Sequence, residues 1–191
     1  MLTRERVLEI FKKADVLLEG HFQLTSGRHS NRYLQCARVF QYPEFAQELC
    51  AALAKQFEDK DVDVVVGPAL GGVVMAYETA RAMKTRGLFV ERDKEGTMTL
   101  RRGFVIQPGE RVLVVEDVVT TGGSVREAIE VIKDLGGEVI GVGSIVDRSA
   151  GQADFGVPYA SLIQVAVESF DPTDCPLCKE GTPAVKPGSR K

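Results

Sequence analysis

The sequence contains no tryptophan, only two histidines and only four cysteines among its 191 residues. Four cysteines in a chain of this length, with only Cys175 and Cys178 close together, do not make the disulfide framework of a small secreted protein. No apolar stretch approaches the roughly 20 residues that cross a bilayer, and residues 1–14 are charged and amphipathic, without a signal-peptide apolar stretch. We therefore expect reduced thiols, a cytoplasmic location and no membrane partner.

The chain also lacks an excess of positive charge. Its formal net charge is -3, and no long run of lysine or arginine supplies a local attraction to a polyanion. We therefore expect no nucleic-acid partner. The hydrophobic fraction of 44% and the charged fraction of 27% are typical of a globular protein, and the length fits a single domain spanning residues 1–191.

Aliphatic runs alternate with helix-length segments from residue 62 onward. Continuous Val/Ile runs separated in this way indicate a parallel sheet that is covered by helices on both faces, which is an α/β fold. Ligands of such sheets bind beyond the carboxyl ends of the strands. The expected strands are 62–66, 87–90, 111–115 and 138–146, and the expected helices run from the turn after the first strand to about residue 84 and over 125–135.

The segments outside this alternation have other patterns. Apolar residues at helical spacing predict a first helix over residues 3–19, capped by Gly20, and Pro43 opens a second helix. Residues between these helices look like a loop between extended segments. Residues 91–105 are charged and predict a hairpin or a mobile loop of the kind that often acts as a lid, and residues 168–191 predict a tail over the surface.

Two adjacent carboxylates, Glu116 and Asp117, follow a strand made of buried aliphatics. A carboxylate only accepts hydrogen bonds and a ribose diol offers two donors, so the pair could hold ribose hydroxyls. The alternative is a solvated strand end. An isolated pair of this kind would favour that alternative.

The next residues favour a ligand instead. Thr120, Thr121, Gly122, Gly123 and Ser124 stand just ahead of a predicted helix, where free backbone N–H groups and the helix dipole attract a phosphate. Ser124 could also cap that helix, with Glu127 completing a capping box, and both interpretations are compatible. Neither the P-loop nor the dinucleotide-binding glycine motif is present, so a P-loop NTPase or a dinucleotide dehydrogenase is not expected.

The segment VLVVEDVVTTGGS, residues 112–124, resembles the 5-phosphoribosyl 1-diphosphate (PRPP) signature of the type I phosphoribosyltransferases at every position. Other segments resemble the orotate phosphoribosyltransferases among them. These are LTSGRHSNRY at 24–33, the VGPALGG turn at 66–72, the ERDKEG loop at 91–96 and IVDRS at 145–149. Together they cover most of residues 17–149.

The resemblance implies the type I phosphoribosyltransferase fold, with a small N-terminal hood over residues 1–40 that binds the base, and a mobile loop. It also implies a glycosyltransferase of pyrimidine (UMP) biosynthesis that moves the phosphoribosyl group of PRPP to orotate, giving orotidine 5'-monophosphate and pyrophosphate. Mg2+ would be the cofactor, held mainly by PRPP without a direct protein ligand. The active form would be a homodimer with active sites shared across its interface.

The family roles map onto matching positions of this chain. Catalysis would involve Asp117, Glu116, Arg92 and Lys94, of which the last two would meet the pyrophosphate from the loop. PRPP would be bound by Glu116, Asp117, Val118, Val119, Thr120, Thr121, Gly122, Gly123 and Ser124. Orotate would be bound by Thr120, Arg148, Ser26, Gly27 and Arg28.

This chain departs from the family at some positions. Many members have lysines where it has Thr25 and Gly71, and their loop often contains a further lysine and a histidine, whereas the histidines here are His21 and His29. Cys175 and Cys178 form one C-x-x-C with no nearby histidine in the sequence, so a zinc site would need ligands from another chain. Two unligated thiols are the favoured interpretation, and His29 is expected to be a loop hydrogen-bonder.

Three alternatives remain open. One is a non-catalytic subunit of a heteromer, which the intact acidic and hydroxyl positions of residues 116–124 disfavour. A purine phosphoribosyltransferase would share the PRPP loop, but it would more typically have an aromatic stacking residue and a lysine near Arg148. A PRPP-sensing regulator that acts on nucleic acid would also keep the loop, although the chain has no added DNA-binding domain and is acidic overall.

Overall fold

The computed structural model describes residues 2–24, 26–166 and 168–187. Its centre is a six-stranded sheet in the order β5-β4-β3-β6-β7-β8, in which every neighbouring pair is parallel except β4 and β5. The predicted parallel sheet is therefore confirmed. The strands are β3 (Val64–Pro68), β4 (Arg86–Arg92), β5 (Met98–Leu100), β6 (Arg111–Val119), β7 (Glu138–Asp147) and β8 (Tyr159–Gln164).

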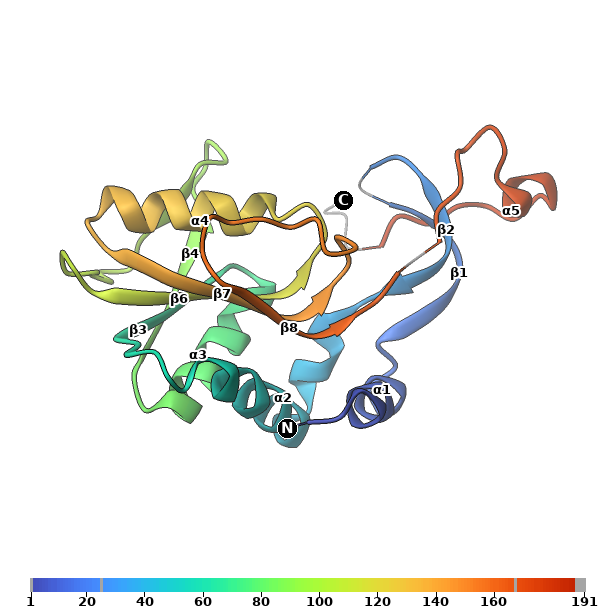
Figure 1. The fold of residues 1–191 in the computed structure, drawn as a ribbon. Coiled ribbons are helices and arrows are strands. Elements are labelled where there is room, and N and C mark those ends of the chain that lie inside the picture. The colour runs from blue at the N-terminus through green and yellow to red at the C-terminus, as the bar shows by residue number, and fades with distance from the viewer. Residues whose placement is uncertain (1, 25, 167, 188–191) are drawn as a thin grey trace.

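Helices cover both faces of the sheet (Figure 1). On one face lie α1 (Arg4–Lys13), α2 (Pro43–Ala54) and α3 (Gly71–Met83), and on the other lies α4 (Gly123–Asp134). Successive side chains of β6 point to opposite faces of the sheet, so Leu113 packs in the hydrophobic core on one face and Val114 in the core on the other. Among the described residues no helix is long and apolar enough to cross a bilayer.

The N-terminal region adds a separate two-stranded sheet. β1 (Leu17–Gln23) pairs antiparallel with β2 (His29–Leu34), and a 3-10 helix (Cys36–Gln41) leads from it to α2. A second 3-10 helix (Lys55–Phe57) follows α2.

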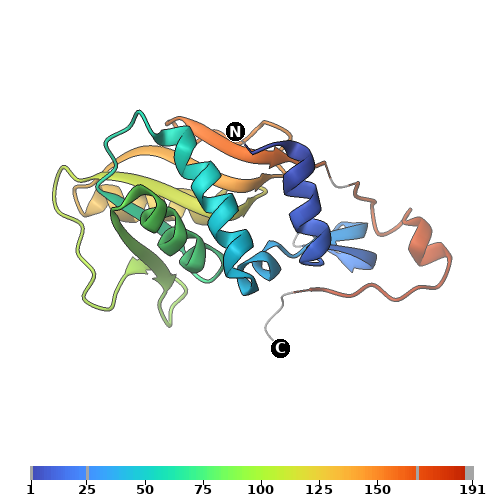
Figure 2. The same cartoon turned by 90° about the horizontal axis from the view of Figure 1, so that it is seen from below.

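The C-terminal tail runs along this β1–β2 hairpin and carries the short helix α5 (Pro176–Lys179), as Figure 2 shows. Its main chain is bonded to both strands, since Val185 N–H donates to the His21 carbonyl and His29 N–H donates to the Phe170 carbonyl. The tail also brings its two cysteines next to two histidines of the hairpin. The expectation that a zinc site would need another chain was therefore wrong.

Three predictions of secondary structure need correction. The first helix ends at Lys13 rather than at residue 19, because Asp15 adopts a left-handed conformation (φ 50°) and Leu17 starts a strand. Gly20 accordingly lies inside β1 and caps no helix. β8 was not predicted as a strand, and β5 was predicted only as part of a hairpin or mobile loop. The predicted helices at Pro43, after the first sheet strand and over 125–135 are confirmed, as is the hairpin formed by β4 and β5.

Candidate active site

The acidic pair lies at the carboxyl edge of the sheet, on the central strand β6. Residues 112–115 of that strand are buried, and Glu116 and Asp117 are half-buried at its end. The Asp117 carboxylate accepts a hydrogen bond of 2.9 Å from the Val118 N–H. The strand end therefore holds both carboxyl groups close to the turn that follows.

The pKa values of this pair are raised. Burial raises the pKa of Glu116 well above its usual range, and the neighbouring charge of Asp117 raises it further. Burial also raises the pKa of Asp117. Among the salt bridges of the described residues, none joins either carboxylate to a lysine or arginine. The pair is thus a concentration of negative charge without a counterion of its own.

The loop after the acidic pair ends at the start of α4. Gly122 is the N-terminal cap of α4 with φ of 75°, and no side chain bonds to the helix start. The predicted capping box of Ser124 and Glu127 is therefore wrong. Gly122 has no room for a side chain either, since an added Cβ would lie 2.7 Å from the Phe155 ring. The first N–H groups of α4 are left for a ligand.

Two cavities meet at this loop. One, of about 270 Å³, is lined by the loop and start of α4 (residues 118–125), Glu116, Glu127 and Arg92. The other, of about 490 Å³, is lined by the hairpin, the strand end and Arg148. Val118, Thr120 and Thr121 line both. An elongated ligand could therefore occupy both cavities while passing the acidic pair.

Arg148 is the cationic group of the larger cavity. It follows β7 directly and is held there by its N–H, which donates to the Val119 carbonyl at 2.7 Å. Its Nε atom is buried without a hydrogen-bond partner, and burial lowers the pKa of its guanidinium. A buried charged donor without an acceptor is unfavourable, so this arrangement favours binding of an anionic or carbonyl-rich ligand.

The turn between β3 and α3 is packed against the acidic pair. A Cβ added to Gly71 would lie 2.8 Å from Asp117 Oδ1, and one added to Gly67 would lie 2.2 Å from the Gly72 carbonyl oxygen. A lysine at position 71 would therefore displace the Asp117 carboxylate.

Comparisons with known proteins agree on one family. The model of the phosphoribosyl transferase domain matches residues 36–167. An orotate phosphoribosyltransferase of Desulforamulus reducens is 58% identical over 190 residues, covering 100% of this chain and 99% of that protein.

Solved structures give the same result. The orotate phosphoribosyltransferase of Aeropyrum pernix has a TM-score of 0.67 and 30% identity, covering 82% of this chain and 93% of that one. The Mycobacterium tuberculosis enzyme in complex with PRPP has a TM-score of 0.66 and 29% identity, covering 83% and 95%. The chain belongs to the orotate phosphoribosyltransferase family.

Arg92, one of the two predicted loop cations, lies beside residues 120–124 of its own chain. It lines the smaller cavity and forms an ion pair of 2.7 Å with Glu127. Lys94 is not brought to that cavity. It lines two neighbouring hollows, one of them shared with Leu70 and Arg92.

Of the predicted orotate-binding residues on the hairpin, one lines the larger cavity and another is turned toward the tail. Ser26 lines the larger cavity. Arg28 is exposed and bonded to the tail, where its Nε donates to Ser169 Oγ at 2.9 Å and its Nη2 donates to the Ser169 carbonyl at 2.7 Å. Gly27 forms the turn between them with φ of 80°. Thr25, where many family members have lysine, lies outside the described residues.

Tyr33 is a cavity residue that the sequence did not indicate. It lies on β2 and lines the larger cavity together with Arg148, and burial raises the pKa of its hydroxyl. The alternating pattern of β2 could have placed it on the same face as a substrate. The sequence analysis expected a purine site, but not an orotate site, to have an aromatic residue near Arg148. Since Tyr33 lies in the same cavity as Arg148, that criterion does not distinguish the two sites. The family comparisons distinguish them instead.

Proposed function

We propose that this chain transfers the 5-phosphoribosyl group of PRPP to orotate, giving orotidine 5'-monophosphate and pyrophosphate, in pyrimidine biosynthesis. The observation that carries the proposal is the pair of cavities that share Val118, Thr120 and Thr121, with the Glu116–Asp117 pair between them. One cavity has the chemistry of a phosphate site, and the other has a buried arginine suited to a ring with a carboxylate and carbonyl oxygens.

PRPP would lie across the loop. Its 5'-phosphate would be bound by the N–H groups and hydroxyls of Thr120, Thr121, Gly122, Gly123 and Ser124, where the dipole of α4 favours an anion. Val118 and Val119 would contribute main-chain contacts. The ribose hydroxyls would donate to Glu116 and Asp117, and this would offset part of the cost of burying two carboxylates.

Orotate would occupy the larger cavity. The orphaned Nε of Arg148 would donate to the ring substituents, while Thr120 and Ser26 would supply polar contacts at its edges. Tyr33 would flank the ring. Arg28 and Gly27 would act at most by shaping the wall, since the Arg28 guanidinium is bonded to Ser169.

The reaction needs no protein nucleophile. A ring nitrogen of orotate forms the new bond to the anomeric carbon, and the bond from that carbon to pyrophosphate breaks with its electron pair going to the leaving group. Positive charge develops on the ribose next to the buried carboxylates, which stabilise it. Arg92, and Lys94 from its own or a partner subunit, would stabilise the departing pyrophosphate.

Mg2+ is proposed as the cofactor, because the residues present fit a divalent cation. Glu116 and Asp117 offer carboxylate oxygens and have no cationic partner. When bound, the ion would neutralise charge on the diphosphate of PRPP, and PRPP would supply most of its ligands.

A cytoplasmic location also remains a prediction from composition.

The test is the ultraviolet change when purified protein is mixed with PRPP and Mg2+ and, in separate cuvettes, orotate, uracil, adenine, hypoxanthine or xanthine. We expect a Mg2+-dependent change with orotate alone. A change with a purine instead would establish the purine transferase. No change with any base despite PRPP binding by calorimetry would favour the regulator, which a gel-shift assay would then examine.

We also propose a homodimer. Leu70, Val74 and Tyr77 are 81%, 42% and 64% exposed and recur at helical spacing, so they form one apolar stripe on and just before α3. This stripe adjoins the hollow lined by Arg92 and Lys94. A partner docked here would bring its own residues close to the pyrophosphate region.

We predict that Tyr77→Asp converts the dimer to a monomer, because a carboxylate within the apolar stripe would be desolvated on association. Analytical ultracentrifugation of wild type and variant measures this directly. Leu8→Asp, at another exposed apolar residue on α1, is the matched control and should leave the dimer intact. A wild type that sediments as a monomer while active would contradict the proposal.

A further inference from the structure

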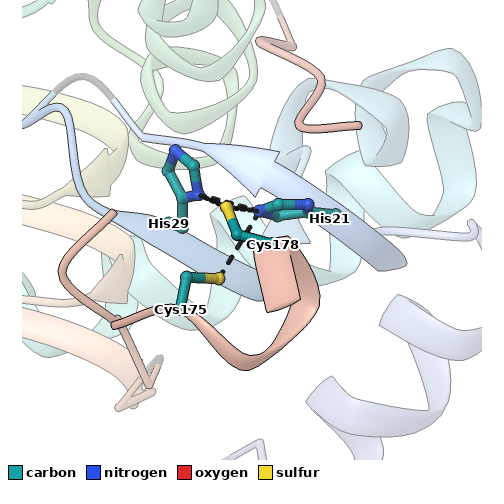
Figure 3. Close-up of side chains that lie close together, drawn as sticks. All are labelled: His21, His29, Cys175 and Cys178. Atoms are coloured by element: carbon teal, nitrogen blue, oxygen red, sulfur yellow. Dashed lines mark hydrogen bonds between the residues drawn. The ribbon is translucent and has the colours of Figure 1, made fainter. Parts of the chain in front are cut away.

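Four potential metal ligands gather away from the active site, between the β1–β2 hairpin and the tail. They are His21, His29, Cys175 and Cys178, and their ligand atoms all lie within 4.8 Å of one another. Figure 3 shows the four side chains pointing toward a common centre, the histidines from two paired strands and the cysteines from both ends of the first turn of α5.

The distances within the cluster suit a single small ion. Cys175 Sγ lies 3.6 Å and Cys178 Sγ 3.8 Å from His21 Nε2, and Cys178 Sγ lies 3.3 Å from His29 Nδ1. Sulfur and nitrogen atoms bound tetrahedrally to zinc at ordinary bond lengths are about 3.5 Å apart. The two nitrogens are closer, at 2.8 Å, and would separate by roughly half an ångström around an ion.

The hydrogen bonding of the imidazoles supports binding of a metal ion. His21 Nδ1 lies 2.6 Å from the Thr182 carbonyl, which only accepts hydrogen bonds, so Nδ1 carries the proton and Nε2 presents its lone pair to the cluster. A backbone carbonyl that orients a histidine through its other ring nitrogen is a common feature of metal sites. Without an ion, His29 Nδ1–H can donate to that lone pair at 2.8 Å.

Burial and ligand type indicate the ion and its role. Cys175, His21 and His29 are 0%, 3% and 8% exposed, so three of the four groups are shielded from water. Two thiolates and two imidazoles suit Zn2+ rather than Mg2+ or Ca2+, which prefer oxygen ligands. Four protein ligands fill a tetrahedral shell and leave no open position, which is the arrangement of structural zinc sites.

We propose that His21, His29, Cys175 and Cys178 bind one Zn2+ that fastens the C-terminal tail to the hairpin. The ion would join segments 154 residues apart in the sequence, beside the main-chain bonds of Val185 and Phe170 to the same strands. The hairpin carries Ser26 and Tyr33, which line the larger cavity. Zinc would therefore hold one wall of the proposed orotate site in place.

The first measurement is the metal content of untagged wild-type protein, purified without a metal-affinity column and analysed by inductively coupled plasma mass spectrometry. We expect about one zinc per chain, released when a mercurial reagent titrates the thiols. Cys175→Ser and Cys178→Ser should each lose most of it. The control Cys50→Ala, which removes a buried thiol of α2, should keep it.

A second measurement covers the case in which the serine variants fail to fold. Zinc-depleted wild type is reconstituted with Co2+, and the visible spectrum is expected to show tetrahedral cobalt with thiolate-to-metal charge transfer. Zinc far below one per chain together with no such spectrum would overturn the proposal. So would a protein lighter by two hydrogens through a Cys175–Cys178 disulfide, and bound iron in place of zinc would overturn the choice of ion.

The functional consequence rests on the proposed orotate site. Zinc removal should lower the melting temperature by more than about 5 °C and raise the Michaelis constant (KM) for orotate more than it lowers kcat. Metal content and melting temperature do not depend on activity. A zinc protein without orotate transfer would refute only the proposed function, and an active protein without zinc would refute only this inference.

Discussion

Asp117→Asn is expected to lower kcat at least about a hundredfold. The amide offers one acceptor and one donor where the carboxylate offers only acceptors, so one ribose hydroxyl loses its partner. The buried negative charge beside the anomeric carbon is lost as well, and that charge acts mainly in the transition state, when the ribose becomes positive. Steady-state kinetics with saturating orotate and PRPP measure the loss.

The same substitution is expected to stabilise the free protein at neutral pH. The folded-state pKa values of Glu116 and Asp117 are raised by burial and by their mutual charge, above the ordinary values of 4.5 and 3.8. A carboxyl whose pKa is higher in the folded state favours folding at low pH, and this contribution is lost as pH rises through the raised pKa. The wild type therefore bears an increasing cost of burying negative charge as pH rises through these raised pKa values.

Melting temperatures measured without PRPP, at about pH 5 and about pH 8, test whether stability falls as pH rises through these pKa values. The advantage of Asp117→Asn over wild type should grow toward the higher pH. Asp59→Asn makes the same chemical change at an exposed carboxylate and should alter neither kcat nor the melting temperature. A kcat that falls less than about threefold in Asp117→Asn would contradict the ribose-binding role.

The strand, turn and helix start of residues 112–124 could be predicted because these parts are adjacent in the sequence. A buried strand, two carboxylates, two glycines and a helix start lie within residues 112–124, and their relation is set by local geometry. Local sequence patterns gave the wrong end for the first helix. Its apolar spacing continues through Leu17 and Leu18, so nothing in the pattern marked the left-handed Asp15 that ends it.

Contacts between distant segments could not be predicted in this way. Cys175 and His21 meet because the tail runs along the hairpin, and this path is fixed by main-chain hydrogen bonds that leave no pattern in the side chains. Arg28 is bonded to Ser169 for the same reason. Residue types therefore indicated which groups can do chemistry, and the long-range path of the chain decided which groups work together.

Arg148→Ala is expected to raise the orotate KM by about tenfold to a hundredfold with a smaller effect on the PRPP KM. A hydrogen bond to a charged group contributes about 1.5–3 kcal/mol, and about 1.4 kcal/mol corresponds to a tenfold change in affinity. The orotate KM of Arg148→Lys should lie between those of the wild type and Arg148→Ala, because an ammonium keeps the charge but loses the planar fork that fits a carboxylate.

Stability distinguishes this binding role from a structural one. Arg148 Nε has no partner in the described structure, so the alanine variant should melt at or slightly above the wild-type temperature. Arg4→Ala, which removes an exposed arginine bonded to the Gln164 carbonyl, is the control for loss of a guanidinium and should leave the orotate KM unchanged. If Arg148→Ala left the orotate KM unchanged, the arginine would not face the base. A raised KM together with a lowered melting temperature would instead mean that Arg148 shapes the cavity from its wall.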